Sequence, residues 1–215
     1  MRDAVRRWYP VALALIAACA SLAVYDRLPE HVTVHWDLAG TPNGFMPRAV
    51  GAFVTPAILL FTWAMLRAAP SIDPRREHYE RGVAYEIVIA TLLIPVFLIH
   101  FAVLAIALGY AVPVARLAPA LMGVMFVVIG SVMPRARSNF VFGIRTPWTL
   151  SSDRVWTRTH RLAGSSMTAA GVVMLVSAAF APVAVLEAII ISAVAAALVA
   201  PAVYSYLTFR RETKQ

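Results

Sequence analysis

The sequence has little of what holds small secreted domains or soluble enzymes together. Cysteine occurs once, at Cys19, and charged residues make up only 14% of the 215 residues. A single cysteine excludes an internal disulfide. A chain that is 60% hydrophobic with so few charges is too apolar for an ordinary soluble domain, so we expect a protein that crosses a membrane.

Recognisable catalytic motifs are also missing. The sequence contains no zinc-binding helix motif, no phosphate-binding loop and no nucleophile spaced with a base. We therefore expect a protein that is not an enzyme and that uses no cofactor.

Lysine is nearly absent, with one lysine against eighteen arginines, and basic residues exceed acidic ones by 19 to 11. Such an excess is typical of proteins that bind nucleic acid. In a membrane protein it is better explained by basic loops retained on the cytoplasmic side. Direct binding of nucleic acid is therefore not expected.

Hydrophobic segments long enough to cross a bilayer are what the sequence does contain. Four such runs cover residues 8–25, 49–66, 82–109 and 117–134. Residues 162–209 form a longer run, which as one helix would measure about 72 Å against a hydrocarbon core of about 30 Å. This run must fold back, and Pro182 is the predicted turn. The sequence thus predicts an all-α membrane protein with six transmembrane helices.

Small residues are frequent in the last run, where Gly164, Gly171 and residues 195–197 let helices approach closely. We expect its two helices to pack tightly against each other.

The positions of the basic residues predict the orientation. If the N-terminus is inside the cell, sixteen of the nineteen Lys and Arg residues fall in inner segments and three in outer segments. Both termini are therefore expected in the cytoplasm. The basic start followed by Ile-Ala-Ala-Cys19 is also similar to a lipoprotein cleavage box. We favour Cys19 as a small apolar helix residue over its lipidation.

The first polar interval, residues 26–48, is predicted to be an ordered outer loop. Polar and apolar residues alternate from His31 to Asp37, and this period of two predicts a short strand. Gly40 and Asn43-Gly44 are expected to supply left-handed turns. His31 and His35 are about 13 Å apart on a strand, too far to share one metal ion, so we favour hydrogen bonds within the loop over a metal site.

The second polar interval, residues 139–161, is basic and aromatic in an otherwise apolar region. Its first part, residues 139–150, is predicted to be a turn around Gly143 and Pro147. Arg145 suits bidentate binding of a carboxylate, or anchoring of the loop to lipid phosphates or helix-end carbonyls. Trp148 is expected to be an interfacial anchor.

From residue 151 the same interval predicts an amphipathic helix that lies along the inner membrane surface. Ser151 and Ser152 suit an N-cap, and Asp153 suits the positive end of a helix. One face carries Val155, Trp156, Thr159 and Leu162, and the other carries Arg154, Arg158 and Arg161. The helix is expected to cover residues 151–163 and to end near Gly164, with Trp156 as a second interfacial anchor.

The residue patterns of both polar intervals resemble those of a known family. Asn-x-x-x-Gly-Ile-Arg-Thr-Pro-Trp-Thr-Leu-Ser-Ser from Asn139, followed by Val-Trp and Thr-His-Arg, is similar to the signature of the SdpI family of bacterial membrane proteins. The outer loop resembles the module of unknown function that often precedes it. The residues shared with that module are Pro29, His35, Asp37, Gly40, Pro42, Asn43 and Gly44, with Arg48 where lysine is usual.

The resemblance implies a multi-pass protein of the bacterial cytoplasmic membrane that gives immunity to a secreted, membrane-active peptide toxin. It also implies signalling by holding a small winged-helix repressor at the membrane. The candidate binding residues in the signature are Asn139, Gly143, Arg145, Thr146, Pro147, Trp148, Ser151, Trp156, Thr159 and His160. Those in the outer loop are His35, Trp36, Asp37, Gly40, Asn43 and Gly44.

Three ionisable residues lie within or at the edges of the predicted helices: Glu86, His100 and Glu187. Because charge is costly in lipid, we expect them to face the bundle interior. A small ion or solute transporter that uses Glu86 and His100 is the alternative function. The second alternative is a metalloprotein built on the outer loop.

The expected organisation has four parts. They are an N-terminal helix pair (1–81) with the outer loop 26–48, a central pair (82–134), the signature segment (135–164) and a C-terminal pair with the tail (165–215).

Overall fold

A computed structural model of the chain describes residues 2–37, 39–79 and 83–213, and for residues 2–6 the backbone alone. The chain divides into two compact units. The first contains Met1–Arg67 and Leu92–Ala118, and the second contains Ala68–Thr91 and Pro119–Gln215. The expected boundary between residues 81 and 82 lies outside the described residues, and the four-part division stays a prediction.

Six helices within the described ranges are long and apolar enough to cross a membrane, which confirms the expected number. They are α1 (Arg2–Val24), α2 (Arg48–Ile72), α3 (Val83–Ala107), α4 (Val114–Val132), α6 (Asp153–Phe180) and α7 (Val183–Glu212). The predicted turn is confirmed, since α6 ends at Phe180 and Pro182 is the N-cap of α7. Pro is suited to this place because it has no N–H to donate and its ring would clash with the carbonyl of the preceding turn if α6 continued.

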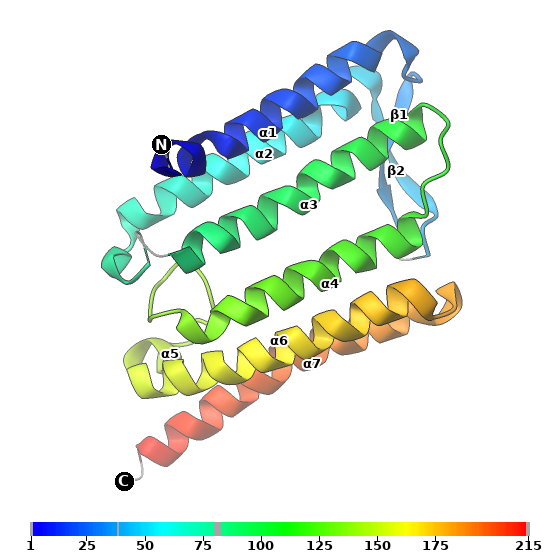
Figure 1. The fold of residues 1–215 in the computed structure, drawn as a ribbon. Helices are drawn as coiled ribbons and strands as arrows, with labels where there is room; N and C mark the ends of the chain where they lie inside the picture. Colours follow the sequence, from blue (N-terminus) through cyan, green and yellow to red (C-terminus); the bar gives the residue numbers. More distant parts are fainter. Residues whose placement is uncertain (1, 38, 80–82, 214–215) are drawn as a thin grey trace. The chain divides into compact units, whose positions relative to one another are not determined.

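The first unit contains a β-hairpin (Figure 1) formed by β1 (His31–Trp36) and β2 (Pro42–Pro47). The strand predicted around Val32 is confirmed as β1. Val32 is fully buried against Leu28, Ala52 and Val103, which join the hairpin to α2 and α3. A Cβ on Gly51 would lie 2.8 Å from Cβ of Val32, so this glycine lets α2 approach the strand closely.

The role predicted for Asn43-Gly44 is wrong. Both residues lie in β2 rather than in a turn, and Gly44 does not have a positive φ. Gly40 does form the turn, with φ of +85°. Gly44 is instead required for space, because a Cβ there would lie 2.7 Å from Cβ of His35, its partner across the irregular ladder.

In the second unit, glycines bring α4 and α6 into backbone contact. A Cβ on Gly123 would lie 2.9 Å from the Gly171 carbonyl oxygen, and one on Gly171 would lie 2.6 Å from the Gly123 oxygen. Gly130 and Gly164, seven residues away on α4 and α6, repeat this arrangement. A Cβ on either glycine would lie 2.8 Å from the carbonyl oxygen of the other. Helices α6 and α7 also run side by side (Figure 1). The close packing expected of the α6–α7 pair is present, but these glycines face α4.

The expected interfacial helix over residues 151–163 is wrong. A short helix α5 covers Pro147–Ser151, and α6 then continues without a break from Asp153 to Phe180. One glycine inside a helix costs only about 1 kcal/mol. Gly164 therefore need not end the helix, and its lack of a side chain allows contact with Pro134 and Gly130.

Candidate recognition site

The imidazole of His160 organises the signature. It is fully buried, and its Nε2 accepts a hydrogen bond from the Ile144 N–H at 3.0 Å. Its Nδ1 donates to the Trp156 carbonyl oxygen at 2.8 Å, and its ring stacks on that of Trp156 with centroids 3.9 Å apart. These bonds define the neutral tautomer with hydrogen on Nδ1. They fasten the turn to the first part of α6.

Gly143 fits this arrangement for two reasons. Its φ of +106° lies in the region that side chains disfavour, and a Cβ there would overlap Nε2 of His160. The turn predicted around Gly143 is therefore present, and glycine is needed both for its backbone and for its contact with the histidine.

Backbone groups of the turn are satisfied by its own side chains. The buried Asn139 accepts hydrogen bonds through Oδ1 from the Val141 and Phe142 N–H groups, at 2.8 and 2.9 Å. Arg145 is exposed, and its Nη1 donates to the Phe140 carbonyl oxygen. This carbonyl belongs to the same loop and not to a helix end, so the two roles considered for Arg145 both stay predictions.

Helix α5 begins with a capping box. Thr146 accepts a hydrogen bond from the Thr149 N–H at 3.2 Å, and Thr149 Oγ1 accepts one from the Thr146 N–H at 2.8 Å. Pro147 occupies the first helical position, which needs no N–H donor. Ser152 caps α6, while Ser151 is the exposed last residue of α5.

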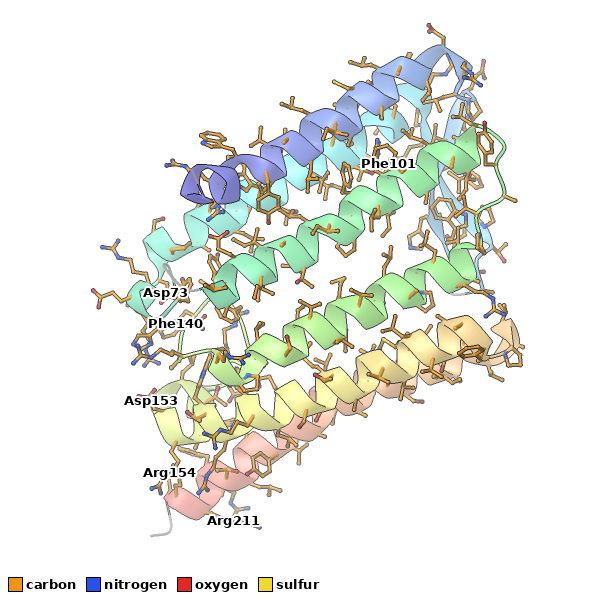
Figure 2. All side chains as sticks on the ribbon, in the orientation of Figure 1. Asp73, Phe101, Phe140, Asp153, Arg154 and Arg211 are labelled. Carbon is orange, nitrogen blue, oxygen red and sulfur yellow. The ribbon has the colours of Figure 1, made fainter. Side chains whose placement is uncertain are left out.

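The structure shows a second loop at this site that sequence reasoning missed. Asp73 is 4% exposed, and its Oδ2 accepts a hydrogen bond from the Phe140 N–H at 2.9 Å (Figure 2). Arg75 donates to Ser138 Oγ and, at 3.0 Å, to the Leu150 carbonyl oxygen. The only signal was that Asp73 and Arg75 lie among the other charged residues between two predicted helices, which is typical of any surface loop.

Aromatic side chains complete the contact between the two loops. The rings of Tyr79, Tyr85 and Phe142 lie 5.0 to 5.9 Å apart, within the range of favourable aromatic pairs. Tyr79 and Tyr85 are buried. The residues after α2 and at the start of α3 therefore pack directly on the signature.

The two tryptophans of the signature differ in their surroundings. Trp156 is 1% exposed and donates to the Ala136 carbonyl oxygen at 2.8 Å, so its predicted role as an interfacial anchor is wrong. Trp148 is half-buried and packs edge-on against Tyr206 of α7. The predicted faces of the helix are present, since Val155 and Thr159 are buried and Arg158 is exposed.

Trp148 Nε1 donates to Ser205 Oγ at 2.7 Å, and Ser205 is fully buried. We predict a coupling energy of about 1 kcal/mol between Trp148→Phe and Ser205→Ala in a double-mutant cycle of unfolding in detergent. A second cycle, which combines Thr146→Ala with Ser205→Ala, is the control. Its two effects on the free energy of unfolding should be additive. Additivity in the Trp148 cycle would show that this hydrogen bond does not hold α5 to α7.

The hairpin carries the other set of predicted binding residues. Asn43 Oδ1 lies 2.6 Å from His35 Nδ1, and Asp37 Oδ1 accepts from the Thr41 N–H at 2.7 Å. Trp36 packs on the core beneath the hairpin. No group of three or more His, Cys, Asp or Glu side chains in the described ranges could hold a metal ion, so the metalloprotein alternative has no ligand set there.

The three ionisable residues of the helices are not equivalent. His100 is fully buried, and its Nε2 lies 3.0 Å from the Ala17 carbonyl oxygen and 3.1 Å from Ser21 Oγ. Glu86 is half-buried in the first turn of α3. Glu187 is exposed, so the expectation that it faces the interior is wrong. It is the fifth residue of α7.

The site residues chiefly bind one another and the backbone. Such an arrangement fixes the path of the segment relative to α6. The fold and this site define the class: a multi-pass membrane protein with an ordered hairpin and a polar segment folded onto the ends of its helices.

Comparison with known proteins then gives matches for two parts of the chain. Residues 135–205 match the SdpI/YfhL protein family, and residues 12–60 match a domain of unknown function (DUF1648). Over 170 residues the chain is 24% identical to the immunity protein SdpI of Bacillus subtilis (strain 168), covering 79% of this chain and 80% of that protein. Residues 135–205 thus match the SdpI/YfhL family and the chain is a distant homologue of that immunity protein, which confirms the resemblance. No solved structure matches it.

Proposed function

We propose that this chain protects the cell that makes it from a secreted, membrane-active peptide, and that it does so by binding rather than by catalysis. The observation that carries the proposal is the similarity to an immunity protein over 79% of the chain. The ordered hairpin supports it, because a rigid polar and aromatic surface suits recognition of a peptide.

The orientation we propose follows the basic residues, sixteen of which fall in segments on the side of the termini. The hairpin is then outside the cell, where a secreted peptide arrives. Holding a repressor at the membrane, and transport through Glu86 and His100, stay predictions.

Phe45 is the residue of the hairpin best placed for contact with an apolar peptide. Its side chain is 59% exposed, and it pairs with Thr33 on the face opposite the buried Val32. An exposed aromatic ring on a rigid strand is a frequent contact residue, since it contributes a large apolar area and loses little conformational entropy on binding.

We predict that Phe45→Ala raises sensitivity to the peptide about tenfold or more without unfolding the protein, the effect of losing a contact residue worth about 1.4 kcal/mol or more. The measurement is survival of a sensitive strain that expresses the full chain, challenged with a panel of secreted membrane-active peptides. Val50→Ala is the matched control, because Val50 is 49% exposed in the same unit but lies on α2.

Wild-type expression that protects against none of the peptides would overturn the proposed function. Protection that is equally strong with Phe45→Ala and wild type would instead remove Phe45 from the binding surface and leave immunity standing.

A further inference from the structure

A continuous apolar groove follows the pair α6 and α7. It consists of two adjoining segments of about 700 and 720 Å³, which share Ala196 and Ala200. One end is lined by Val173 and Val185, and the other by Leu162 and Leu207, as expected for antiparallel helices. Each segment is within the size range of small-molecule sites, roughly 300–1,000 Å³.

Two arginines lie one helical turn beyond the end of the groove that Leu162 and Leu207 line. Arg158 lies one turn before Leu162 on the same face of α6, and Arg211 lies one turn after Leu207 on α7. Both side chains are exposed, and within the described part of the chain neither has a hydrogen-bond or ion-pair partner. Figure 2 shows Arg211 and Arg154 at this same end of the helix pair.

Nearby carboxylates leave this charge largely uncompensated. Glu212 accepts a hydrogen bond from Ser152 Oγ at 3.0 Å and pairs with Arg154 at 3.8 Å, so it is already engaged with the start of α6. Asp153 is exposed, but five residues of helix place it about 140° around the axis from Arg158. The free arginines therefore favour an anion.

The depth of the arginines in the membrane indicates which kind of anion they meet. Twenty residues of helix cover a hydrocarbon core of about 30 Å, and counting back from Phe180 at the far end of α6 reaches residue 161. Arg158 is then at the depth of the lipid headgroups, directly beyond the apolar groove. Tyr204 lines the groove near the same end, at a depth where tyrosine is common.

We propose that this groove is a binding site for an anionic phospholipid. The acyl chains lie along Ala196 and Ala200, and the guanidinium groups of Arg158 and Arg211 bind the phosphate. Arginine suits this role because its planar donors match phosphate oxygens in pairs. The site rests on α6 and α7 alone and is independent of immunity.

The test is native mass spectrometry of the full chain in detergent, titrated with phosphatidylglycerol or phosphatidylcholine. We expect one phosphatidylglycerol to bind at least tenfold more tightly than phosphatidylcholine. The double variant Arg158→Gln/Arg211→Gln should lose that preference. Ala196→Phe, which fills the groove and keeps the charge, should weaken phosphatidylglycerol binding about as much.

Arg161→Gln is the matched control, because it removes the same charge one residue before Leu162 but on the flank of the helix. It should change the affinity less than twofold. An equal loss with Arg161→Gln, or equal binding of both lipids, would overturn the proposal in favour of unspecific attraction. Full competition by soluble glycerol phosphate would also overturn it, since the site would then bind phosphate without acyl chains.

Discussion

His160→Ala is expected to lower the free energy of unfolding by about 3–5 kcal/mol. The substitution empties the space of a fully buried ring that stacks on Trp156. It also leaves the Ile144 N–H without the acceptor that now lies 3.0 Å away. Both losses act on the contact that joins the turn to α6. The measurement is chemical unfolding of the purified protein in detergent.

His35→Ala is the control for this prediction. That histidine is exposed on the hairpin, so its replacement should cost less than about 1 kcal/mol. Similar losses for the two histidines would mean that burial of His160 does not stabilise the signature.

Gly164→Ala should also destabilise the protein, by about 1–3 kcal/mol. On helix propensity alone the change would stabilise α6 by up to about 1 kcal/mol. The added Cβ would, however, lie 2.7 Å from Cγ of Pro134 and 2.8 Å from the Gly130 carbonyl oxygen. Because that oxygen belongs to the backbone of α4, the helices would have to separate. The sign of the change therefore distinguishes close packing from propensity.

Ser165→Ala provides the comparison, since Ser165 is the next residue of α6 and is exposed. It should leave stability within about 0.5 kcal/mol of wild type. A stabilising effect of Gly164→Ala would show that α4 and α6 are not held at the distance described.

Hydrophobic length alone predicted the membrane helices, because a bilayer sets the length that a segment needs. Local patterns also predicted β1, the turn at Gly40 and the exposed arginine face of α6. These features depend on residues close in the sequence. The alternation around Val32 or the spacing of Arg154, Arg158 and Arg161 is visible without knowledge of any partner.

Features that depend on distant residues were missed or misinterpreted. Local rules predict that a helix ends at Gly164. In the structure Gly164 lies inside α6, where its close approach to Gly130 requires a glycine. Asn43-Gly44 is a typical turn sequence, but glycine is needed at position 44 because a Cβ there would collide with His35 on the opposite strand. Asp73 satisfies a backbone N–H sixty-seven residues away, a partner that no spacing rule identifies.

The sequence singled out the signature as one polar segment, but it did not show which contacts its residues make. Trp156 was placed on the apolar face, yet nothing in the sequence showed that this face meets the turn containing Gly143 and Ile144 rather than lipid. His160 had no visible partner, because its acceptor role depends on the path of that turn.

The central claim is that the chain protects by binding a peptide and leaves it chemically unchanged. The most direct test incubates wild-type protein in lipid nanodiscs with an excess of a peptide against which expression protects, and follows the peptide's mass and its bound fraction over time. We predict an unchanged mass and binding that saturates at a fixed ratio of peptide to protein. Cleaved or modified peptide that accumulates beyond one equivalent per protein would contradict the account and identify an enzyme.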